Sequence, residues 1–166
     1  LNNEHKRVDE YVQMIINGNK VSLITDAGTP CISDPGFLLI REAIKNNILM
    51  TCLPGPTAFV PALVMSGLPS DSFIFEGFLP RKKGRKSKLN EISQNTKTTI
   101  LYESPFRIIK TLSEMKETIG SDRKIAIVRE ISKIYEEVFR GKIDEAIQEY
   151  SERTIKGEFV ICIDKA

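Results

Sequence analysis

The chain has 166 residues, of which 41% are hydrophobic and 28% charged, and its 24 basic residues nearly balance 22 acidic ones. This is the composition of an ordinary globular protein, which excludes collagen-like, coiled-coil and intrinsically disordered classes. The longest apolar run, Ala58 to Met65, has eight residues and contains a proline, whereas a helix that spans a bilayer needs roughly 20.

The first part of the chain alternates predicted helices and strands. Apolar side chains recur at helical spacing from Glu4 to Ile16, and Asn17-Gly18 ends that helix. Asp34-Pro35 has the pattern of a helix start. The expected elements are strands over residues 21–25 and 48–53, a helix beginning at 34 with Leu39, Ile40, Ala43 and Ile44 on its core face, and a helix over 57–66. Strand, glycine-containing turn and helix occur twice in this order, which predicts a parallel sheet covered by helices.

The pattern changes after residues 67–71, where proline, glycine and serine cluster. We therefore expect two α/β domains, residues 1–71 and 72–166. Strands are predicted over 73–78, 98–103, 124–129, 135–140 and 158–164, and helices over 87–94, 105–119 (capped by Ser104 and stopped by Gly120) and 143–150. The short connection between the strands at 124–129 and 135–140 favours an antiparallel pair, and so a mixed sheet. Because the chain opens at Leu1, directly before a helix pattern, we expect a fragment of a longer protein.

Two loops rich in glycine and proline, residues 26–30 and 53–58, follow the first two predicted strands. Ligands of open α/β sheets bind beyond the carboxyl ends of the strands. Asp26 can accept hydrogen bonds from a ligand, and Thr57 lies at a helix N-terminus with free N–H groups. Either loop alone is equally explained as a tight turn, but the two together indicate a small-molecule site.

A phosphatase reading of the first loop is disfavoured. Asp26-Ala27-Gly28-Thr29 resembles the nucleophile loop of haloacid-dehalogenase-type phosphatases, but these need a second Asp at the position of Gly28. The chain also lacks the glycine-rich phosphate loop that ends in Gly-Lys-Ser/Thr.

Residues 81–88, Arg-Lys-Lys-Gly-Arg-Lys-Ser-Lys, carry six positive charges and no acid. A basic run on an otherwise mildly acidic chain indicates contact with a phosphate backbone, although a solvated loop is the ordinary alternative. Phe75 and Phe78 precede this run and are candidates for base stacking, but alternating strand residues of this kind more often belong to a core.

Three cysteines, Cys31, Cys52 and Cys162, are widely spaced and form no Cys-x-x-Cys pair. This usage is typical of a reduced, cytoplasmic protein without a disulfide framework. With a single histidine in the chain, it also argues against a zinc site.

Several motifs now occur together in a fixed order: Ser-Leu-Ile-Thr-Asp-Ala-Gly-Thr-Pro at 22–30, Ile-Ser-Asp-Pro-Gly at 32–36, Leu-Pro-Gly-Pro-Thr-Ala at 53–58, Phe-Glu-Gly-Phe-Leu-Pro-Arg-Lys at 75–82, Tyr-Glu-Ser-Pro at 102–105, Arg107, Arg129-Glu130 and Lys-Gly-Glu-Phe at 156–159. This series closely resembles the small-subunit ribosomal RNA methyltransferases of the tetrapyrrole (class III) methylase superfamily, over essentially the whole chain. The resemblance implies a two-domain class III fold with an incomplete parallel-sheet first domain and a mixed-sheet second domain. The family's N-terminal strand and Thr-Pro-Ile-Gly-Asn-type loop would precede residue 1.

The implied activity is S-adenosylmethionine-dependent 2′-O-methylation of a cytidine in the decoding region of small-subunit rRNA. The family binds the cofactor between its two domains and works as a homodimer on rRNA or a 30S-type particle, without a metal or a membrane. Carried over by motif, the cofactor-binding residues are Asp26, Ala27, Gly28, Thr29, Pro30, Ile32, Ser33, Gly55, Pro56, Thr57, Ala58, Tyr102, Glu103, Ala126, Gly157 and Glu158. The chain departs from the family at Cys31, where glycine is usual, and at Phe106, where histidine is expected.

A ribose hydroxyl is a poor nucleophile, so methyl transfer requires alignment and help in losing a proton. The candidates for this role are Glu130, Lys133 and Glu137; a lysine would have to be desolvated to act as a base near neutral pH. The expected RNA contacts are Arg81, Lys82, Lys83, Arg85, Lys86, Lys88, Arg107 and Arg129.

Two alternatives stay open. One is a class III methylase that acts on a small molecule such as a tetrapyrrole, and the other is a non-catalytic RNA-binding fragment. Cofactor binding separates the enzymes from the RNA-binding module, and salt-sensitive RNA binding separates the rRNA enzyme from the small-molecule enzyme.

Overall fold

A computed structural model describes residues 4–166 of the chain, which divide into two compact units, residues up to Thr57 and residues from Ala58 onward. Within the described residues, no helix combines the length and the apolar character that crossing a bilayer requires.

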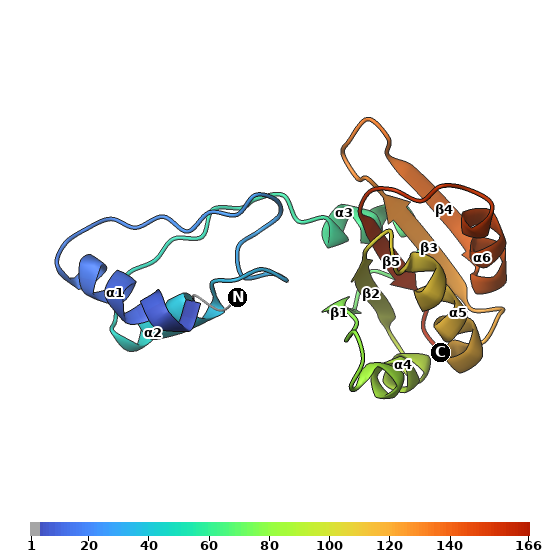
Figure 1. The fold of residues 1–166 in the computed structure, drawn as a ribbon, viewed down its shortest axis with the longest axis horizontal. Helices are drawn as coiled ribbons and strands as arrows, with labels where there is room; N and C mark the ends of the chain where they lie inside the picture. The colour runs from blue at the N-terminus through green and yellow to red at the C-terminus, as the bar shows by residue number, and fades with distance from the viewer. Residues whose placement is uncertain (1–3) are drawn as a thin grey trace. The chain divides into compact units, whose positions relative to one another are not determined.

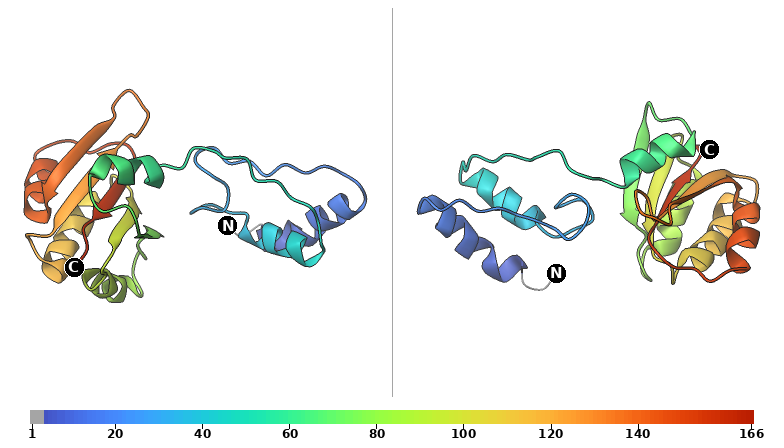
Figure 2. Two further views of the ribbon diagram at one scale, coloured as in Figure 1. Left: turned by 180° about the vertical axis from the view of Figure 1, so that it is seen from behind. Right: turned by 90° about the horizontal axis from the view of Figure 1, so that it is seen from above.

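The first unit contains two helices that lie against each other, α1 (Glu4–Ile16) and α2 (Phe37–Lys45) (Figure 2). The helix predicted over residues 4–16 is confirmed, and Val8 and Val12 of its apolar stripe are buried. The second helix begins at Phe37, later than predicted, with Gly36 as its N-cap at φ 130°. Asp34 does not cap it, because its carboxylate instead accepts a hydrogen bond from Thr25 Oγ1 at 2.9 Å.

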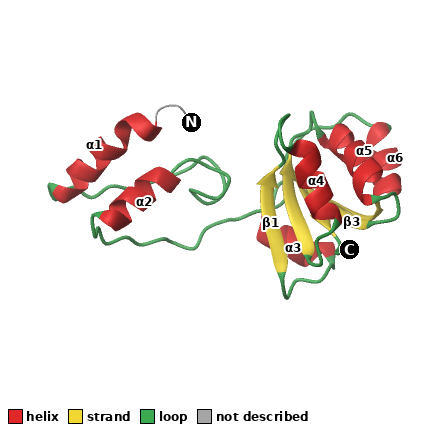
Figure 3. Cartoon of the chain, turned by 90° about the horizontal axis from the view of Figure 1, so that it is seen from below, coloured by secondary structure: helices red, strands yellow, loops and turns green. Residues whose placement is uncertain are grey.

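The two strands expected in the first unit do not form, so the prediction of a parallel sheet there is wrong for this structure. Residues 17–36 and 46–58 run as loops between the helices (Figure 3). Ile24 and Leu49 are 85% and 98% exposed. The apolar, β-branched composition that predicted the strands reports a preference for a pleated, buried surface. It does not supply the hydrogen-bonding neighbours and covering layer without which two strands are marginally stable at best.

The second unit is built on a five-stranded mixed sheet, as predicted. Its strands are β1 (Phe73–Phe78), β2 (Thr98–Glu103), β3 (Lys124–Arg129), β4 (Glu137–Lys142) and β5 (Phe159–Ile163), in the order β1-β2-β5-β3-β4. The β1/β2 pair is parallel, and the β2/β5, β5/β3 and β3/β4 pairs are antiparallel. Helices α4 (Arg85–Ser93), α5 (Ile108–Ile119) and α6 (Ile143–Ser151) cover one face, and α3 (Phe59–Ser66) covers the other (Figure 1).

The core lies on both faces of the central strand β5. Phe159, Ile161 and Ile163 pack with α4, α5 and α6, whereas Val160 and Cys162 pack on the α3 side. All five residues are buried, which explains why this strand reads as an unbroken apolar run.

Helix α3 belongs to the second unit, because Ala62 and Leu63 are buried against the sheet. The domain boundary that we expected after residue 71 falls on the far side of this helix, whereas the compact units divide before it. A proline- and glycine-rich stretch predicts a turn, but it does not predict which unit the helix before it packs against.

Two elements begin later than predicted, because turns use the preceding residues. The carbonyl of Ser104 accepts hydrogen bonds from the N–H groups of Arg107 and Ile108, so α5 starts at Ile108 and Ser104 is not its cap. Backbone bonds from Lys133 to Glu130 and from Glu136 to Lys133 delay β4 to Glu137.

Candidate functional site

The topology of the second unit brings most of its predicted site residues to one edge of the sheet. Strands β1, β2 and β3 run in the same direction, since β2 and β3 are both antiparallel to β5. Their carboxyl ends therefore share an edge with the start of β5. The residues at or just beyond this edge are Tyr102, Glu103, Arg107, Arg129, Glu130, Lys133, Glu137, Gly157 and Glu158. Ala126 is not among them, because it lies in the middle of β3, buried under α3.

A cluster of three charges joins the loop after β3 to the start of β5. Lys133 Nζ donates to Glu130 Oε1 at 2.9 Å and to Glu158 Oε2 at 2.8 Å. The Glu158 N–H also donates to Glu130 Oε1 at 2.9 Å. A Cβ on Gly157 would lie 2.5–2.7 Å from the Glu130 side chain, and Gly157 has φ 96°. Only glycine therefore permits this close approach without displacing Glu130.

The backbone of the same loop is strained, since Glu130 and Ser132 have φ of 50° and 61°. Non-glycine residues at positive φ cost of order 1–3 kcal/mol each and cluster at functional sites. The strain coincides with the charge cluster, which supports a functional role for this loop.

The electrostatics of the cluster oppose a proton-accepting role. Hydrogen bonding to Glu158 and Glu130 raises the pKa of Lys133, so its ammonium stays protonated near neutral pH. The bonds from the Lys133 ammonium and the Glu158 N–H lower the pKa of Glu130, which makes its carboxylate a weaker base. Lys133 in particular lacks the desolvation that a basic lysine would need, since its side chain is 47% exposed.

Glu137 lies in a second charge group at the start of β4. Its Oε2 pairs with Arg129 Nη1 at 3.2 Å and its Oε1 with Arg153 Nη2. Arg129 Nε also donates to the carbonyl of Lys156 at 2.6 Å. Two guanidinium groups thus neutralise this carboxylate, and Arg129 is tied to protein groups on two sides.

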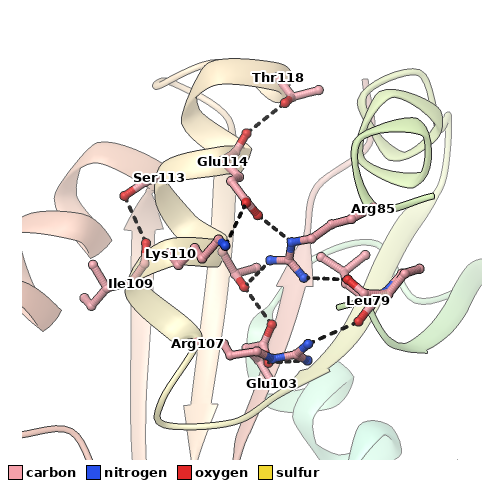
Figure 4. A network of polar contacts seen from close by, with 11 residues as sticks. Leu79, Arg85, Glu103, Arg107, Ile109, Lys110, Ser113, Glu114 and Thr118 are labelled. Atoms are coloured by element: carbon pink, nitrogen blue, oxygen red, sulfur yellow. Dashed lines mark hydrogen bonds and ion pairs between the residues drawn. The ribbon is translucent and has the colours of Figure 1, made fainter. Parts of the chain in front are cut away.

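Buried polar groups connect β2, α4 and α5 (Figure 4). Glu103, 2% exposed, accepts at Oε1 from the Ser104 N–H and Arg107 Nε, both at 2.8 Å, and at Oε2 from Thr111 Oγ1 at 2.6 Å. The Thr111 hydroxyl in turn accepts from Arg85 Nη2 at 2.7 Å. Arg85 Nε pairs with Glu114 Oε2 at 2.6 Å. Both oxygens of the Glu103 carboxylate are thus engaged by groups of the protein.

The basic run at 81–88 separates into two kinds of residue. Arg85, which we predicted to contact RNA, is 6% exposed, and its guanidinium is bonded to Glu114, Thr111 and the Pro80 carbonyl. Lys88 pairs with Glu76 and Glu91. The remaining cations are exposed and make no ion pair within the described residues: Arg81, Lys82, Lys83 and Lys86. A charge run in the sequence does not show which of its members the helix start at residue 85 turns inward.

In the first unit, the structure brings the two predicted cofactor loops together. Thr29 Oγ1 lies 2.8 Å from Thr57 Oγ1 and donates to the carbonyl of Pro56 at 3.2 Å. Asp26 and Gly28 are exposed, and a Cβ on Gly28 would meet nothing within 4 Å. The two loops therefore present the Thr29 and Thr57 hydroxyls, the Asp26 carboxylate and the open backbone at Gly28.

Cys31, where the resemblance led us to expect glycine, has φ 71° in this loop. A side chain is strained in that region, so the usual glycine has a physical reason here.

Two residues of the edge and its support escaped the sequence analysis. Arg153, which pairs with Glu137, had no sequence signal. Thr111 did have one, because it is a polar residue on the apolar stripe formed by Ile108, Leu112 and Met115. Within the described residues, no three His, Cys, Asp or Glu side chains are arranged to hold a metal ion.

A family model described as tetrapyrrole (corrin/porphyrin) methylases matches residues 2–147. The chain belongs to this family. The ribosomal RNA small subunit methyltransferase I of Thermotoga maritima is 40% identical over 161 residues, which are 97% of this chain and 72% of that protein. The protein of the same name from Mycobacterium bovis is 46% identical over 143 residues, which are 86% of this chain and 50% of that protein. The chain therefore spans about half the length of that relative.

Solved structures of the family share the fold. The methyltransferase CobJ superposes with a TM-score of 0.71 at 18% identity, covering 98% of this chain and 72% of CobJ. A uroporphyrin-III C-methyltransferase from Thermus thermophilus, solved in complex with S-adenyl homocysteine, gives 0.59 at 16% identity, covering 95% of this chain and 73% of that one. These likenesses confirm the expected class III α/β fold.

Proposed function

We propose that this chain serves in the S-adenosylmethionine-dependent methylation of small-subunit ribosomal RNA, at the ribose 2′-hydroxyl of a cytidine in the decoding region. The observation that carries the proposal is 40–46% identity, along most of the chain, to relatives named ribosomal RNA small subunit methyltransferase I. The exposed cations Arg81, Lys82, Lys83 and Lys86 support a polyanionic substrate over a small tetrapyrrole.

The donor set of the first unit fits S-adenosylmethionine. The Asp26 carboxylate suits a ribose hydroxyl or an ammonium group, and the Thr29 and Thr57 hydroxyls and open backbone suit the polar parts of the same molecule. A Cβ on Gly55 would have only the Leu53 carbonyl and Thr29 Oγ1 nearby, both at 3.9 Å, so this loop also leaves room for close approach. We assign the cofactor to the loops at 26–33 and 55–57.

The cofactor supplies a methyl group on a sulfonium centre and leaves as a neutral thioether once the C–S bond breaks. The protein must therefore orient the ribose and receive or pass on one proton. Because Lys133 stays protonated and pairs with Glu130 and Glu158, we assign this cluster to electrostatic positioning at the edge of the sheet rather than to proton removal. Glu137, held by Arg129 and Arg153, is assigned the same kind of role.

The proposed partners are small-subunit rRNA or a 30S-type particle, which places the reaction in the cytoplasm, and a second copy of the protein in a homodimer. Sedimentation of the purified protein tests the dimer directly.

The function is tested on the complete gene product, first by calorimetric titration with S-adenosylmethionine and then by transfer of a tritiated methyl group to 30S particles and to naked rRNA. A 2′-O-methyl group blocks alkaline cleavage at its nucleotide, so a protected cytidine identifies the position. Asp26→Ala is expected to weaken cofactor binding at least about tenfold. Asp9→Ala, an exposed aspartate of α1, is the matched control and should bind like the wild type.

No cofactor binding by the intact protein would contradict the proposal and favour the RNA-binding module. Methyl transfer to a tetrapyrrole instead of RNA would favour the small-molecule enzyme.

A further inference from the structure

Two exposed phenyl rings lie at the ends of adjacent strands of the second unit. Phe106, just after β2, is 95% exposed, and Phe78, the last residue of β1, is 52% exposed. In the parallel β1/β2 pair, Phe78 lies opposite Tyr102. Arg107 Nη1 donates to the carbonyl of Leu79 at 3.4 Å, which ties the loop after β2 to the loop after β1 (Figure 4). The two phenylalanines therefore lie on neighbouring segments at one corner of this unit.

The chain on both sides of Phe106 is fixed by hydrogen bonds to the buried Glu103. Ser104, two residues before Phe106, donates its N–H to the buried Glu103 carboxylate, and Arg107, the next residue after Phe106, donates to the same oxygen. Glu103 is itself anchored to Thr111 of α5. The Phe106 ring is 95% exposed and so contributes little to packing, and the backbone that carries it is fixed before any contact forms.

Phe78 is supported in a similar way. Its ring meets Tyr102 edge-on, with centroids 5.6 Å apart, and the Tyr102 hydroxyl accepts a hydrogen bond from the Phe59 N–H. Phe75, by contrast, stacks on Phe59 at 4.3 Å and packs against the core. Of the two aromatic residues that the sequence offered for stacking, only Phe78 presents half of its surface.

Uncompensated positive charge follows Phe78 within a few residues. Arg81, Lys82, Lys83 and Lys86 have no ion-pair partner in the part of the chain that is described, whereas the nearby acids are engaged. Glu76 pairs with Lys88, Glu103 with Arg107 and Glu114 with Arg85. A ligand that complements this corner must combine negative charge with flat apolar faces.

We propose that Phe106 and Phe78 form a stacking platform for unpaired nucleobases, with the adjoining phosphates on the cations of the loop at 81–86. The substrate segment that reaches this unit is then single-stranded RNA, because a duplex keeps its base faces inside the stack. This inference rests on the proposed function, since it takes RNA as the substrate, and it adds the strandedness and the residues that read it.

The test is fluorescence anisotropy of the full chain with a labelled 12-nucleotide single-stranded RNA of mixed sequence, and with the same strand in a duplex. Stacking on one aromatic side chain changes affinity by roughly 5- to 100-fold, so Phe106→Ala should weaken single-strand binding within that range and leave duplex binding unchanged. Phe106→Tyr should restore the affinity, whereas Phe106→Leu should not. Phe37→Ala, at a 61% exposed phenylalanine of α2, is the matched control and should have no effect.

A salt series separates stacking from charge. Phe106→Ala should keep the wild-type slope of log affinity against log salt, while the double variant Lys82→Gln/Lys83→Gln should lower its magnitude by about 1.4, at roughly 0.7 per phosphate contact on a single strand.

The inference is overturned if Phe106→Ala binds the single strand like the wild type, if it weakens duplex binding equally, or if Phe106→Leu suffices. It is also overturned if Phe106→Ala changes the sedimentation coefficient, which would make the corner a contact between copies. If the single-strand preference depends on Phe106 but no methyl group reaches RNA, the proposed enzymatic function fails while the platform stands. If RNA is methylated without that dependence, the platform alone fails.

Discussion

Two apolar segments of similar composition have opposite fates in the two units. Phe159–Ile163 of the second unit is completely buried as the central strand β5, whereas residues 48–53 of the first unit run as loop with Leu49 98% exposed. Both were predicted as strands from the same kind of apolar run. The difference teaches that composition gives a segment the capacity to pair, and that neighbours on both sides decide whether it is buried.

The largest expected contrast between the units is in cysteine chemistry. Cys162 is fully buried, and burial raises the pKa of its thiol to about 12, so about one molecule in 10,000 carries the reactive thiolate at pH 8. Cys52 of the first unit is exposed. With iodoacetamide at pH 8, we expect Cys52 to be alkylated at least about 100-fold faster than Cys162, as measured by peptide mass spectrometry. In guanidinium chloride the two rates should converge; equal rates in the native protein would contradict the buried position of β5.

A matched pair of leucines measures the same contrast as stability. Leu112 of α5 is 0% exposed, so Leu112→Ala should lower the free energy of unfolding by about 2–5 kcal/mol through lost burial and a residual cavity. Leu49→Ala should change it by less than about 0.5 kcal/mol. Urea denaturation followed by circular dichroism gives both values. A comparable loss at Leu49 would mean that the first unit buries this side chain in solution.

Two neighbouring cations of the second unit, Arg85 and Lys86, are expected to contribute differently to stability and to RNA affinity. Arg85→Met removes the partner of Glu114 and one bond of Thr111, and should cost about 2–3 kcal/mol of unfolding free energy. Lys86→Met, at an exposed position, should cost less than about 0.5 kcal/mol. RNA affinity should respond in the opposite order, falling for Lys86→Met and little for Arg85→Met under conditions where both are folded. The same denaturation experiment and a filter-binding assay decide the matter, and an Arg85→Met protein as stable as the wild type would refute the buried network.

The smallest expected effect sharpens the description of the first unit. Cys31→Gly relieves a side chain from φ 71° and should stabilise this unit by roughly 0.5 kcal/mol after the larger unfolded-state entropy of glycine is subtracted. Cys52→Gly, where φ is not positive, should destabilise it slightly. Hydrogen exchange of the α1 and α2 amides reports both signs, and a loss of protection in Cys31→Gly would contradict the left-handed conformation.

The elements of the second unit were predictable from sequence because their local apolar patterns agree with how they pack. The five strands of the second unit and the antiparallel β3/β4 pair follow from apolar runs and from a connection too short for a crossover. The membership of α3 could not be predicted, because an apolar helix does not identify which sheet it covers. The fate of residues 21–25 and 48–53 could not be predicted either, because pairing is a non-local property.

For the candidate site, we predicted Glu130 and Lys133 as candidates for the proton-accepting role and Glu158 as a cofactor contact, and the topology brings the three within hydrogen-bonding distance. The sequence did not predict which charged side chains form ion pairs and hydrogen bonds with one another. Glu103 belongs to the Tyr-Glu-Ser-Pro motif and Arg85 to the basic run, yet Thr111 links both to the interior. Lys133 carries an amine that could act as a base, but its hydrogen bonds to Glu158 and Glu130 raise its pKa and keep it protonated.

The strand order of the second unit has a consequence for its synthesis. Strands β1 and β2 form one half of the sheet and β3 and β4 the other, and the hydrogen bonds that link the two halves all run through β5. The segment that unites them is therefore the last of the five to leave the ribosome. Until residues 159–163 emerge, the nascent chain holds a parallel β1/β2 pair and an antiparallel β3/β4 pair with open strand edges, which are sites for chaperones or for misassociation. We therefore expect the sheet to be completed by a single late insertion of β5 at its centre.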